Sequence, residues 1–211
     1  MTPIVVKFGG ELLEDPTRLG ALTAALAKLS RKTPLVIVHG GGREIDAALA
    51  RVGIAKRQVD GLRITDEPTL DVVVGVLAGL INTRLVAALV AAGVRAVGLT
   101  GADAGIGRVQ PARPHVSTSG AIVDLGRVGE PVGKDRPALL DDLCKKGYVP
   151  VVSSIGAARD VFVADGRYLA GLAGLARHGR KAGAGKSTRI VNGKSVKHRH
   201  LRQKAAERRG A

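Results

Sequence analysis

The sequence predicts an α/β protein, a three-layer αβα sandwich built around a mainly parallel sheet. Short β-branched runs alternate with stretches of ten or more residues that have helical spacing of apolar side chains. Such alternation is typical of parallel sheets with helices on both faces. Two of the runs also end directly in glycines, a combination from which α/β proteins form anion sites. With 211 residues, the chain is long enough for one large domain or two small ones.

Two glycine turns organise the N-terminal part of the chain. Residues 3–8 form the first expected strand and run into Gly9-Gly10, while Leu35–Val38 forms the second and runs into His39–Gly42. Glycines let backbone N–H groups approach a phosphate closely, and the N-terminus of the following helix favours negative charge. Lys7 adds a cation beside the first turn. Because ligands bind at the carboxyl ends of parallel strands, we expect both turns to line one pocket.

The remaining elements follow in the order that their boundary residues indicate. The longest helix begins at Asp66-Glu67-Pro68, which has the composition of an N-terminal cap, and ends before Gly93. Asp15-Pro16 introduces the first helix, and Pro34 opens the second strand. In chain order, we expect helices at residues 17–29, 43–52, 66–92, 137–146 and 168–177. Further strands are expected at 94–99, at 147–156 including its exit loop, and at 160–164, with extended or hairpin segments at 59–65 and 107–126.

Composition limits the environments in which this chain works. A single cysteine, Cys144, excludes an internal disulfide and favours a reducing, cytoplasmic location. It lies in an apolar helical stretch, so we expect a packed thiol rather than a nucleophile. The N-terminus has no secretory signal pattern. The sequence contains no uninterrupted apolar run of roughly eighteen residues, the length that would indicate a membrane span. No membrane partner is therefore expected.

Positive charge is concentrated in the last quarter of the chain. The formal net charge is +15, and residues 157–211 carry fourteen Lys and Arg against three Asp and Glu. Residues 192–211 have no apolar face and are expected to form a basic, disordered or loosely helical tail. Such a tail binds nucleic acid weakly and without sequence preference through counterion release, and it lacks the aromatics that stack on bases. A tail that is merely solvated is the other interpretation.

Four blocks of sequence occur in a fixed order and spacing over residues 3–156. They are Val6-Lys7-Phe8-Gly9-Gly10, Val36–Gly42, Gly61-Leu62-Arg63-Ile64-Thr65, and Gly126-Arg127-Val128-Gly129-Glu130 followed by Gly147–Gly156. One glycine block would be unspecific, whereas the whole set in this order is specific. The set resembles the N-acetylglutamate kinases of the amino acid kinase family.

The resemblance implies a phosphotransferase with a carboxyl acceptor. Such an enzyme uses ATP with Mg²⁺ to phosphorylate the side-chain carboxylate of N-acetyl-L-glutamate, a step of arginine biosynthesis. By position, Lys7 resembles the lysine that stabilises the transferring phosphoryl group, and Gly9 and Gly10 resemble the glycines that contact phosphate. These roles suit phosphoryl transfer, which depends on charge neutralisation and positioning more than on a covalent nucleophile.

The same resemblance implies a set of substrate-binding residues. Gly41 and Gly42 match the pair whose backbone holds the acylated amino acid, and Arg63 resembles the arginine that pairs with its carboxylate. An arginine suits this role because its planar guanidinium binds a carboxylate with two parallel hydrogen bonds. No set of metal-ligating side chains is assigned.

After Ser153–Gly156 the resemblance changes. The family continues with an Asn-x-Asn-Ala-Asp segment and a nucleotide-binding half that contains Gly-Met-x-x-Lys, and neither segment is found here. Instead, Ala158–Arg167 resembles the family's final strand and Ser187–Val191 its usual ending. The C-terminal lobe is therefore interpreted as truncated, by a deletion after Gly156 or by a shifted reading frame. We expect an amino-acid-substrate lobe at residues 1–156, a remnant final strand and helix at 157–191, and the basic tail at 192–211.

Three functions are compatible with these patterns. The first is an acetylglutamate kinase, which by resemblance would form a homodimer through its N-terminal lobe, with the helix at 66–92 as candidate interface. The second is a non-catalytic fragment or binding module that still binds N-acetyl-L-glutamate or dimerises. The third is a basic accessory protein that binds polyanions through its tail. Of the other polar residues, His39 is expected to be packed rather than catalytic, and Asp103 to cap its glycine-rich loop.

Overall fold

The computed structural model describes residues 3–9, 15–132, 137–164, 190–191 and 194–195. The chain divides into two compact units, Met1–Arg177 and His178–Ala211, and each is described by itself. The described part of the second unit is one antiparallel pair of short strands, β13 (Ile190–Val191) and β14 (Lys194–Ser195). All other described elements belong to the first unit.

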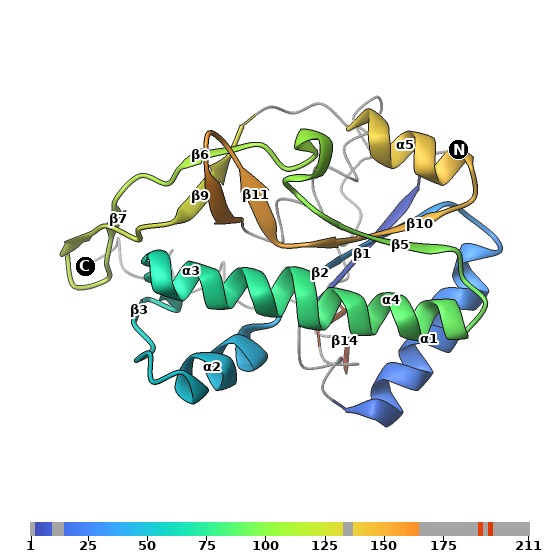
Figure 1. The fold of residues 1–211 in the computed structure, drawn as a ribbon, viewed down its shortest axis with the longest axis horizontal. Coiled ribbons are helices and arrows are strands. Elements are labelled where there is room, and N and C mark those ends of the chain that lie inside the picture. Colours follow the sequence, from blue (N-terminus) through green and yellow to red (C-terminus); the bar gives the residue numbers. More distant parts are fainter. Residues whose placement is uncertain (1–2, 10–14, 133–136, 165–189, 192–193, 196–211) are drawn as a thin grey trace, which may run out of the picture. The chain divides into compact units, whose positions relative to one another are not determined.

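A four-stranded parallel sheet lies at the centre of the first unit (Figure 1). Its strands follow the order β1 (Ile4–Phe8), β2 (Leu35–His39), β10 (Val149–Ser153) and β5 (Ala96–Thr100). Every residue of β2 and β10 is buried, as expected for β-branched strands that are covered on both faces. The predicted α/β class with a mainly parallel sheet is therefore confirmed.

The register of this sheet brings four strand ends together. Phe8 is paired with His39, His39 with Ser153, and Ser153 with Thr100. Because the four strands run in the same direction, the loops that follow these residues leave from one edge of the sheet. That edge is the usual ligand-binding side of an open parallel sheet.

Helices α1 (Pro16–Ser30), α2 (Gly42–Arg51) and one long helix cover the first face of the sheet. The long helix consists of α3 (Glu67–Val74), a π-helical segment η2 (Gly75–Ile81) and α4 (Asn82–Ala91), and it crosses in front of the strands in Figure 1. Its core side chains recur at every fourth position and join one hydrophobic cluster with the sheet: Val73, Leu77, Ile81, Leu85 and Leu89.

Capping residues set the helix ends where the sequence predicts them. The Asp15 carboxylate accepts a hydrogen bond from the Thr17 backbone N–H at 2.8 Å, and the Asp66 carboxylate accepts one from Thr69 N–H at 3.1 Å. Gly93 follows the long helix with a φ of +80°, a left-handed conformation that favours glycine after a helix. The π-helical segment inside the long helix was not predicted, because apolar periodicity does not reveal it.

Helix α5 (Ala138–Lys145) and a second, mixed sheet cover the other face of the central sheet. The second sheet has the order β11 (Ile155–Ala157), β12 (Val161–Ala164), β9 (Val128–Pro131) and β6 (Val109–Pro111). Cys144 is buried in this layer, which confirms the expected packed thiol. The expected exit loop after the fourth strand is wrong in one respect, because β11 pairs with β12 immediately after the chain leaves the central sheet.

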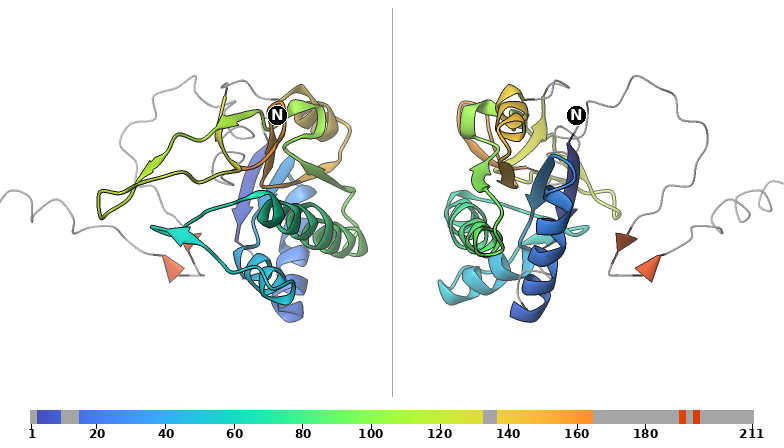
Figure 2. Two further views of the ribbon diagram at one scale, coloured as in Figure 1. Left: turned by 60° about the vertical axis from the view of Figure 1, so that its left-hand side comes forward. Right: turned by 90° about the vertical axis from the view of Figure 1, so that its right-hand side faces the viewer.

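Two hairpins extend from the first unit (Figure 2). One joins β3 (Gln58–Val59) to β4 (Leu62–Arg63), and the other joins β7 (His115–Val116) to β8 (Ile122–Val123). The turn of the first hairpin is Asp60-Gly61, with φ values of +48° and +79°. Two positive φ values are typical of a type I′ turn, for which Asp-Gly is a preferred sequence. The predicted hairpin at residues 59–65 is thus confirmed.

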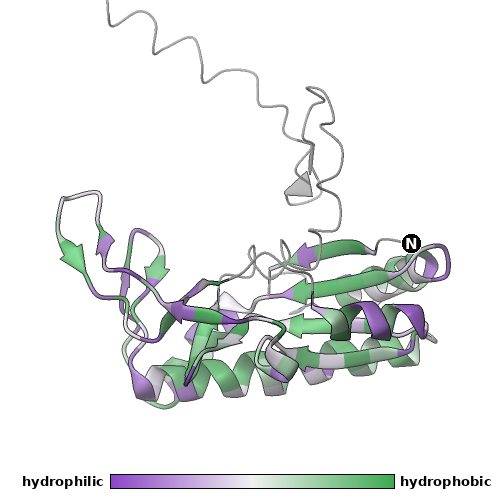
Figure 3. Cartoon of the chain, turned by 90° about the horizontal axis from the view of Figure 1, so that it is seen from above, coloured by the Kyte–Doolittle hydropathy of each residue, from purple (hydrophilic) through white to green (hydrophobic). Residues whose placement is uncertain are grey.

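The long helix is the most apolar element of the described chain. Glu67–Ala91 is long and apolar enough, by length and composition alone, to cross a membrane. Figure 3 shows its predominantly hydrophobic colouring, which the central strands share. Core helices of soluble proteins have the same composition, and one side of this helix packs into the hydrophobic cluster against the sheet. We therefore interpret it as a core helix.

Some predictions concern residues outside the described ranges. These are the helix at 168–177, Gly10, and the basic tail at 192–211 apart from the short strand β14. The predicted division of the chain at residue 157 also stays a prediction.

Burial predicts unequal effects of two matched substitutions on the long helix. Leu85 is 1% exposed in the core, whereas Leu80 on the same helix is 44% exposed. Leu85→Ala should lower the free energy of unfolding by about 2–5 kcal/mol, because it removes buried methyl groups and leaves a cavity. Leu80→Ala should change it by roughly 0.5 kcal/mol or less. Urea unfolding followed by circular dichroism measures both, and equal effects would contradict this packing.

Candidate functional site

The candidate site lies where the glycine turns leave the central sheet. Gly9 follows β1, and Gly40-Gly41-Gly42 follows β2 and leads directly into α2. The Gly40 backbone N–H donates a hydrogen bond to the Phe8 carbonyl oxygen at 3.2 Å, so the two turns begin side by side. Ser153-Ser154 ends β10 in the same row. The structure thus brings the predicted turns together at one edge.

Packing requires a glycine at only one of these positions. A Cβ atom on Gly41 would collide with the Ile81 side chain and would lie 3.2 Å from Leu77. A Cβ atom on Gly9, Gly40 or Gly42 would meet nothing within 4 Å among the described residues. The space above these three glycines is therefore open to a ligand. The missing side chain of Gly41, by contrast, allows the long helix to pack closely against the turn.

The N-terminus of α2 offers backbone donors at the second turn. Gly41 is the N-cap residue and has no side chain to accept hydrogen bonds from the first-turn N–H groups. Unfilled N–H groups and the helix dipole together favour an anion at this position. The first turn of α2 also contains Glu44, whose negative charge opposes the binding of an anion. The electrostatic potential at the turn therefore depends on nearby cations as well.

Arg63 is the cation that the structure holds beside α2. Its Nη2 donates to the Asp46 carboxylate, and Lys56 Nζ lies 2.8 Å from the second oxygen of Asp46. The Arg63 side chain is 18% exposed, and its Nη1 is buried without a hydrogen-bond partner in the described part of the chain. One half of the guanidinium is therefore anchored by protein, and the other half is left for a further acceptor.

The charge state of Asp46 supports this anchor. Burial raises the pKa of Asp46, but hydrogen bonds and charges from Lys56 and Arg63 outweigh burial, so that the pKa lies below its usual value. The carboxylate is therefore ionised at neutral pH and restrains the Arg63 guanidinium.

Lys7 lies on the strand beside the turn but on the other face of the sheet. Phe8 packs into the helical layer, and alternation along the strand places the Lys7 side chain on the face of Val5. Lys7 is exposed and makes no ion pair within the described residues. Gly41, Gly42 and Arg63 are thus gathered around α2, while Lys7 and Gly9 belong to the neighbouring strand.

A buried polar pair lies behind the glycine turn, and sequence reasoning missed one of its members, Asn82. The His39 ring is fully buried, and its Nε2 lies 3.1 Å from Nδ2 of Asn82 in the long helix. The same Asn82 Nδ2 lies 2.9 Å from the Val151 carbonyl oxygen. Burial lowers the pKa of His39 to about 4, although a backbone hydrogen bond with Gly40 acts in the opposite direction. His39 is therefore neutral at pH 7, as befits the packed role that was expected. A single asparagine inside the apolar run of the long helix was the available sequence signal for Asn82.

Two other polar residues at this edge have structural partners. Ser154 Oγ donates to the His39 carbonyl oxygen at 2.8 Å. The Asp103 carboxylate accepts hydrogen bonds from Thr100 N–H at 2.6 Å and from Thr100 Oγ1 at 2.9 Å. Asp103 therefore caps its loop, as predicted.

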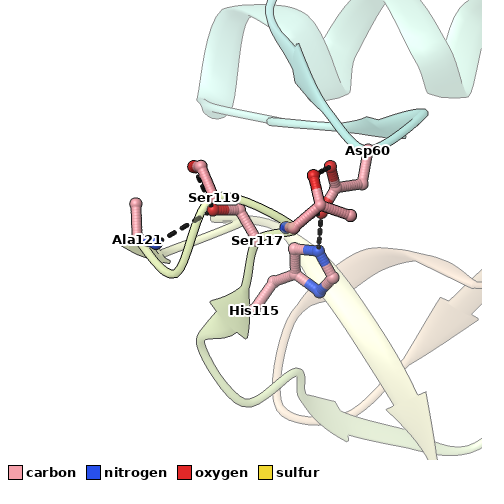
Figure 4. Close-up of polar contacts among 6 residues, drawn as sticks. Asp60, His115, Ser117, Ser119 and Ala121 are labelled. Carbon is pink, nitrogen blue, oxygen red and sulfur yellow. Dashed lines mark hydrogen bonds and ion pairs between the residues drawn. The ribbon is translucent and has the colours of Figure 1, made fainter.

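The hairpin that carries Arg63 is tied to its surroundings at both ends. At its tip, the Asp60 carboxylate accepts hydrogen bonds from His115 Nε2, Thr118 N–H and Thr118 Oγ1 at 2.8–2.9 Å (Figure 4). These hydrogen bonds, first that from His115, lower the pKa of Asp60. At its base, Thr65 N–H donates to the Leu125 carbonyl oxygen at 2.9 Å. The β7–β8 hairpin therefore restrains the strand on which Arg63 lies.

Within the described ranges, no group of three or more His, Cys, Asp and Glu is arranged to hold a metal ion. The chemistry that these residues offer is the binding of anions by Arg63, Lys7 and the backbone N–H groups of a helix N-terminus.

The parallel sheet, the paired glycine turns and the N-terminus of α2 define an α/β protein with a candidate anion site at one edge of its sheet. The model of the Amino acid kinase family matches residues 2–175. This chain belongs to the amino acid kinase family.

Among individual proteins, the chain is similar to curated acetylglutamate kinases, which confirms the predicted resemblance. It is 49% identical over 156 residues to the enzyme of Chloroflexus aurantiacus, covering 74% of this chain and 58% of that protein. It is 44% identical over 161 residues to the enzyme of Sorangium cellulosum, covering 75% of this chain and 56% of that one. The chain thus spans a little more than half the length of these curated relatives.

Solved structures show the same fold. The smu.665 protein of Streptococcus mutans superimposes with a TM-score of 0.64 at 21% identity, over 80% of this chain and 65% of that one. N-acetylglutamate synthase from Neisseria gonorrhoeae, solved with coenzyme A and N-acetyl-glutamate, has a TM-score of 0.61 at 27% identity. The latter match covers 78% of this chain and 36% of the synthase.

The buried His39 predicts a loss of stability in mild acid. The pKa of His39 is about 4 in the folded chain, below the usual histidine value of 6.5, so the unfolded chain binds the proton more readily. The stabilisation is therefore fully present above pH 6.5 and is lost as the pH falls toward 4. The loss should amount to about 3 kcal/mol of unfolding free energy.

Urea unfolding between pH 4 and 7 tests this, with His39→Asn as the variant that cannot titrate at this position. Carboxylates titrate in both proteins, so the difference between the two curves isolates His39. Parallel curves over this range would show that His39 titrates normally.

The Asp60 cluster predicts coupled motion of the two hairpins. Asp60→Asn keeps the size of the side chain but removes the charge that accepts from His115 and Thr118. Exchange of the Thr118 amide hydrogen should become about tenfold faster, because a charge-assisted hydrogen bond is lost. Asp71→Asn, an exposed site on α3, serves as the control and should leave this rate unchanged. Hydrogen exchange followed by NMR measures both rates.

Proposed function

We propose that this chain binds N-acetyl-L-glutamate at the edge of its parallel sheet and acts with ATP and Mg²⁺ as a phosphotransferase on the side-chain carboxylate of that ligand. In this role it is a cytoplasmic protein of arginine biosynthesis. Membership of the amino acid kinase family and identities of 44–49% to acetylglutamate kinases support the assignment.

One observation carries the substrate-binding part of this proposal. The buried Nη1 of Arg63 has no acceptor among the described residues, although Nη2 of the same guanidinium is held by Asp46. A buried donor without a partner is unfavourable by roughly 1–3 kcal/mol, so it needs an explanation. A ligand carboxylate beside α2 supplies the acceptor, and the N–H groups of the first turn of α2 bind a second polar group of the same ligand.

In the proposed reaction, Lys7 and Gly9 contact the phosphoryl group that is transferred. The open space above Gly9 lets its backbone approach a phosphate, and Lys7 supplies an exposed cation on the same strand. In phosphoryl transfer, such groups neutralise charge on the transferring oxygens and position them. Gly10 would complete this turn.

A non-catalytic binding protein is the second candidate. The observation in its favour is the extent of the match, which covers 74–75% of this chain and 56–58% of the acetylglutamate kinases of Chloroflexus aurantiacus and Sorangium cellulosum. The residues proposed to bind the ligand, Gly41, Gly42 and Arg63, all lie within the described part, and binding by them requires no turnover.

We further propose that the chain forms a homodimer through the long helix. A groove of about 430 Å³ lies between α4 and β5, and its lining includes Ala78, Val86, Val90 and Leu99. Val90, which lines this groove, is 54% exposed, and Leu80 on the same long helix is 44% exposed, so a partner helix on this side would bury apolar surface. Light scattering on the purified chain distinguishes a dimer from a monomer.

Ligand binding is tested with two matched arginine variants. Arg63→Gln should raise the dissociation constant for N-acetyl-L-glutamate by about tenfold to a hundredfold, because a charge-assisted hydrogen bond is lost. Arg57→Gln, at an exposed arginine that pairs with Asp66, should leave it unchanged. Isothermal titration calorimetry measures both dissociation constants. An unchanged dissociation constant in Arg63→Gln would contradict the proposed role of Arg63 in binding the ligand.

Turnover is tested separately with a coupled ADP-release assay on the pure chain. If the chain is a kinase, activity with N-acetyl-L-glutamate and Mg-ATP should fall by about a hundredfold or more in Lys7→Ala, because electrostatic stabilisation of the transition state is lost. Lys28→Ala, on the exposed side of α1, is the control. Binding without turnover in the wild-type chain would favour the non-catalytic candidate.

A further inference from the structure

We propose that His39 and Asn82 are positioning residues that hold the Gly40-Gly41 peptide in the orientation required for ligand binding. The inference rests on the proposed function for the identity of the ligand, but its geometry rests on the buried contacts behind the glycine turn. Neither residue is expected to touch the ligand, since the His39 ring is fully buried and Asn82 is 5% exposed.

The hydrogen bonds define which nitrogen of His39 carries the proton. Asn82 Nδ2 lies 2.9 Å from the Val151 carbonyl oxygen and 3.4 Å from that of Leu99, and carbonyl oxygens only accept. These two neighbours identify the atom as the amide nitrogen, which only donates. The amide has two hydrogens for three neighbouring acceptors, and the Leu99 oxygen is the most distant of these. The two shorter contacts therefore take the hydrogens, so that His39 Nε2, at 3.1 Å, accepts one of them.

The neutral ring then carries its proton on Nδ1. Burial keeps the ring neutral by lowering the pKa of His39, and a neutral imidazole with an accepting Nε2 is protonated at Nδ1. Nδ1 lies 3.3 Å from the Gly40 carbonyl oxygen. Asn82 thereby turns His39 into a hydrogen-bond donor to the first peptide of the glycine turn.

Fixing this carbonyl oxygen also fixes a backbone donor. In a trans peptide the C=O and the following N–H point to opposite sides of the bond. A Gly40 carbonyl oxygen held toward His39 therefore directs the Gly41 N–H away from the ring. The flanking groups of the turn are held by other contacts: the Gly40 N–H donates to the Phe8 carbonyl oxygen at 3.2 Å, and the Gly41 carbonyl oxygen accepts from the Ile45 N–H at 3.0 Å.

The geometry of the long helix places Asn82 next to His39. Its π-helical segment ends at Ile81, so the wider helical turn lies directly before Asn82. Ile81 covers Gly41, and a Cβ atom on Gly98 would collide with the Asn82 side chain. Gly41 in the turn after β2 and Gly98 in β5 thus make room for two consecutive residues of the helix. A shift of one residue in helix register would remove Asn82 from His39.

The test combines a tautomer measurement with ligand affinity. In the wild-type chain, long-range ¹H–¹⁵N NMR should show His39 protonated at Nδ1 at pH 7. Asn82→Asp keeps the shape but replaces the donor with an acceptor, so the His39 proton should move to Nε2 or the ring should become charged. The Gly41 amide signal should shift, and the dissociation constant for N-acetyl-L-glutamate should rise by about tenfold.

The control is Arg84→Ala, at an exposed position two residues further along α4, which should change none of the three readouts. A wild-type His39 protonated at Nε2 would overturn the inference, and this measurement does not depend on whether any variant folds. A folded Asn82→Asp protein with an unshifted Gly41 amide would overturn it as well.

The outcome for ligand binding is distinguishable from the outcome for positioning. If the wild-type chain fails to bind N-acetyl-L-glutamate while the tautomer and the Gly41 amide respond as expected, the proposed function fails and the positioning role stands. If the wild-type chain binds and Asn82→Asp binds equally well, the positioning role fails and the proposed function stands.

Discussion

The close approach of the long helix to the edge of the sheet is the contact on which the rest of this structure depends. It is possible because Gly41 and Gly98 have no side chains at the two places where Ile81 and Asn82 reach the sheet. The approach buries one side of the helix in the main hydrophobic cluster. It also covers the glycine turn from behind, so that only the opposite side of the turn is open.

Around this contact, Arg63 is held by an ion pair and by the hydrogen bonds of its hairpin. Arg63 belongs to the two-residue strand β4, and an isolated two-stranded hairpin is only marginally stable in water. The Asp46 carboxylate on α2 anchors its guanidinium, while Asp60 and Thr65 tie the ends of the hairpin to neighbouring segments. These contacts together restrain the strand on which Arg63 lies.

The family assignment and the geometry address different parts of the function. Membership of the amino acid kinase family rests on a match over residues 2–175, whereas the acetylglutamate kinases of Chloroflexus aurantiacus and Sorangium cellulosum are matched over little more than half their length. The described residues form the edge at which a small acidic ligand would bind, with donors from α2 and Arg63. Substrate binding and phosphoryl transfer are therefore separable questions for this chain, and each has its own experiment.

Local signals in the sequence determined the elements and their ends. Asp15, Asp66 and Gly93 mark helix boundaries through hydrogen bonds or backbone conformation that involve near neighbours, and the β-branched runs with their glycines define the strands and the row of strand ends. Tertiary structure alone decided the rest. The π-helical segment, the face on which Lys7 lies, the pairing of Ile155–Ala157 with β12 and the contact of Asn82 with His39 all depend on partners distant in the chain. Such contacts leave no periodic trace, because a single asparagine in an apolar helix looks the same in sequence whether it faces water or a buried imidazole.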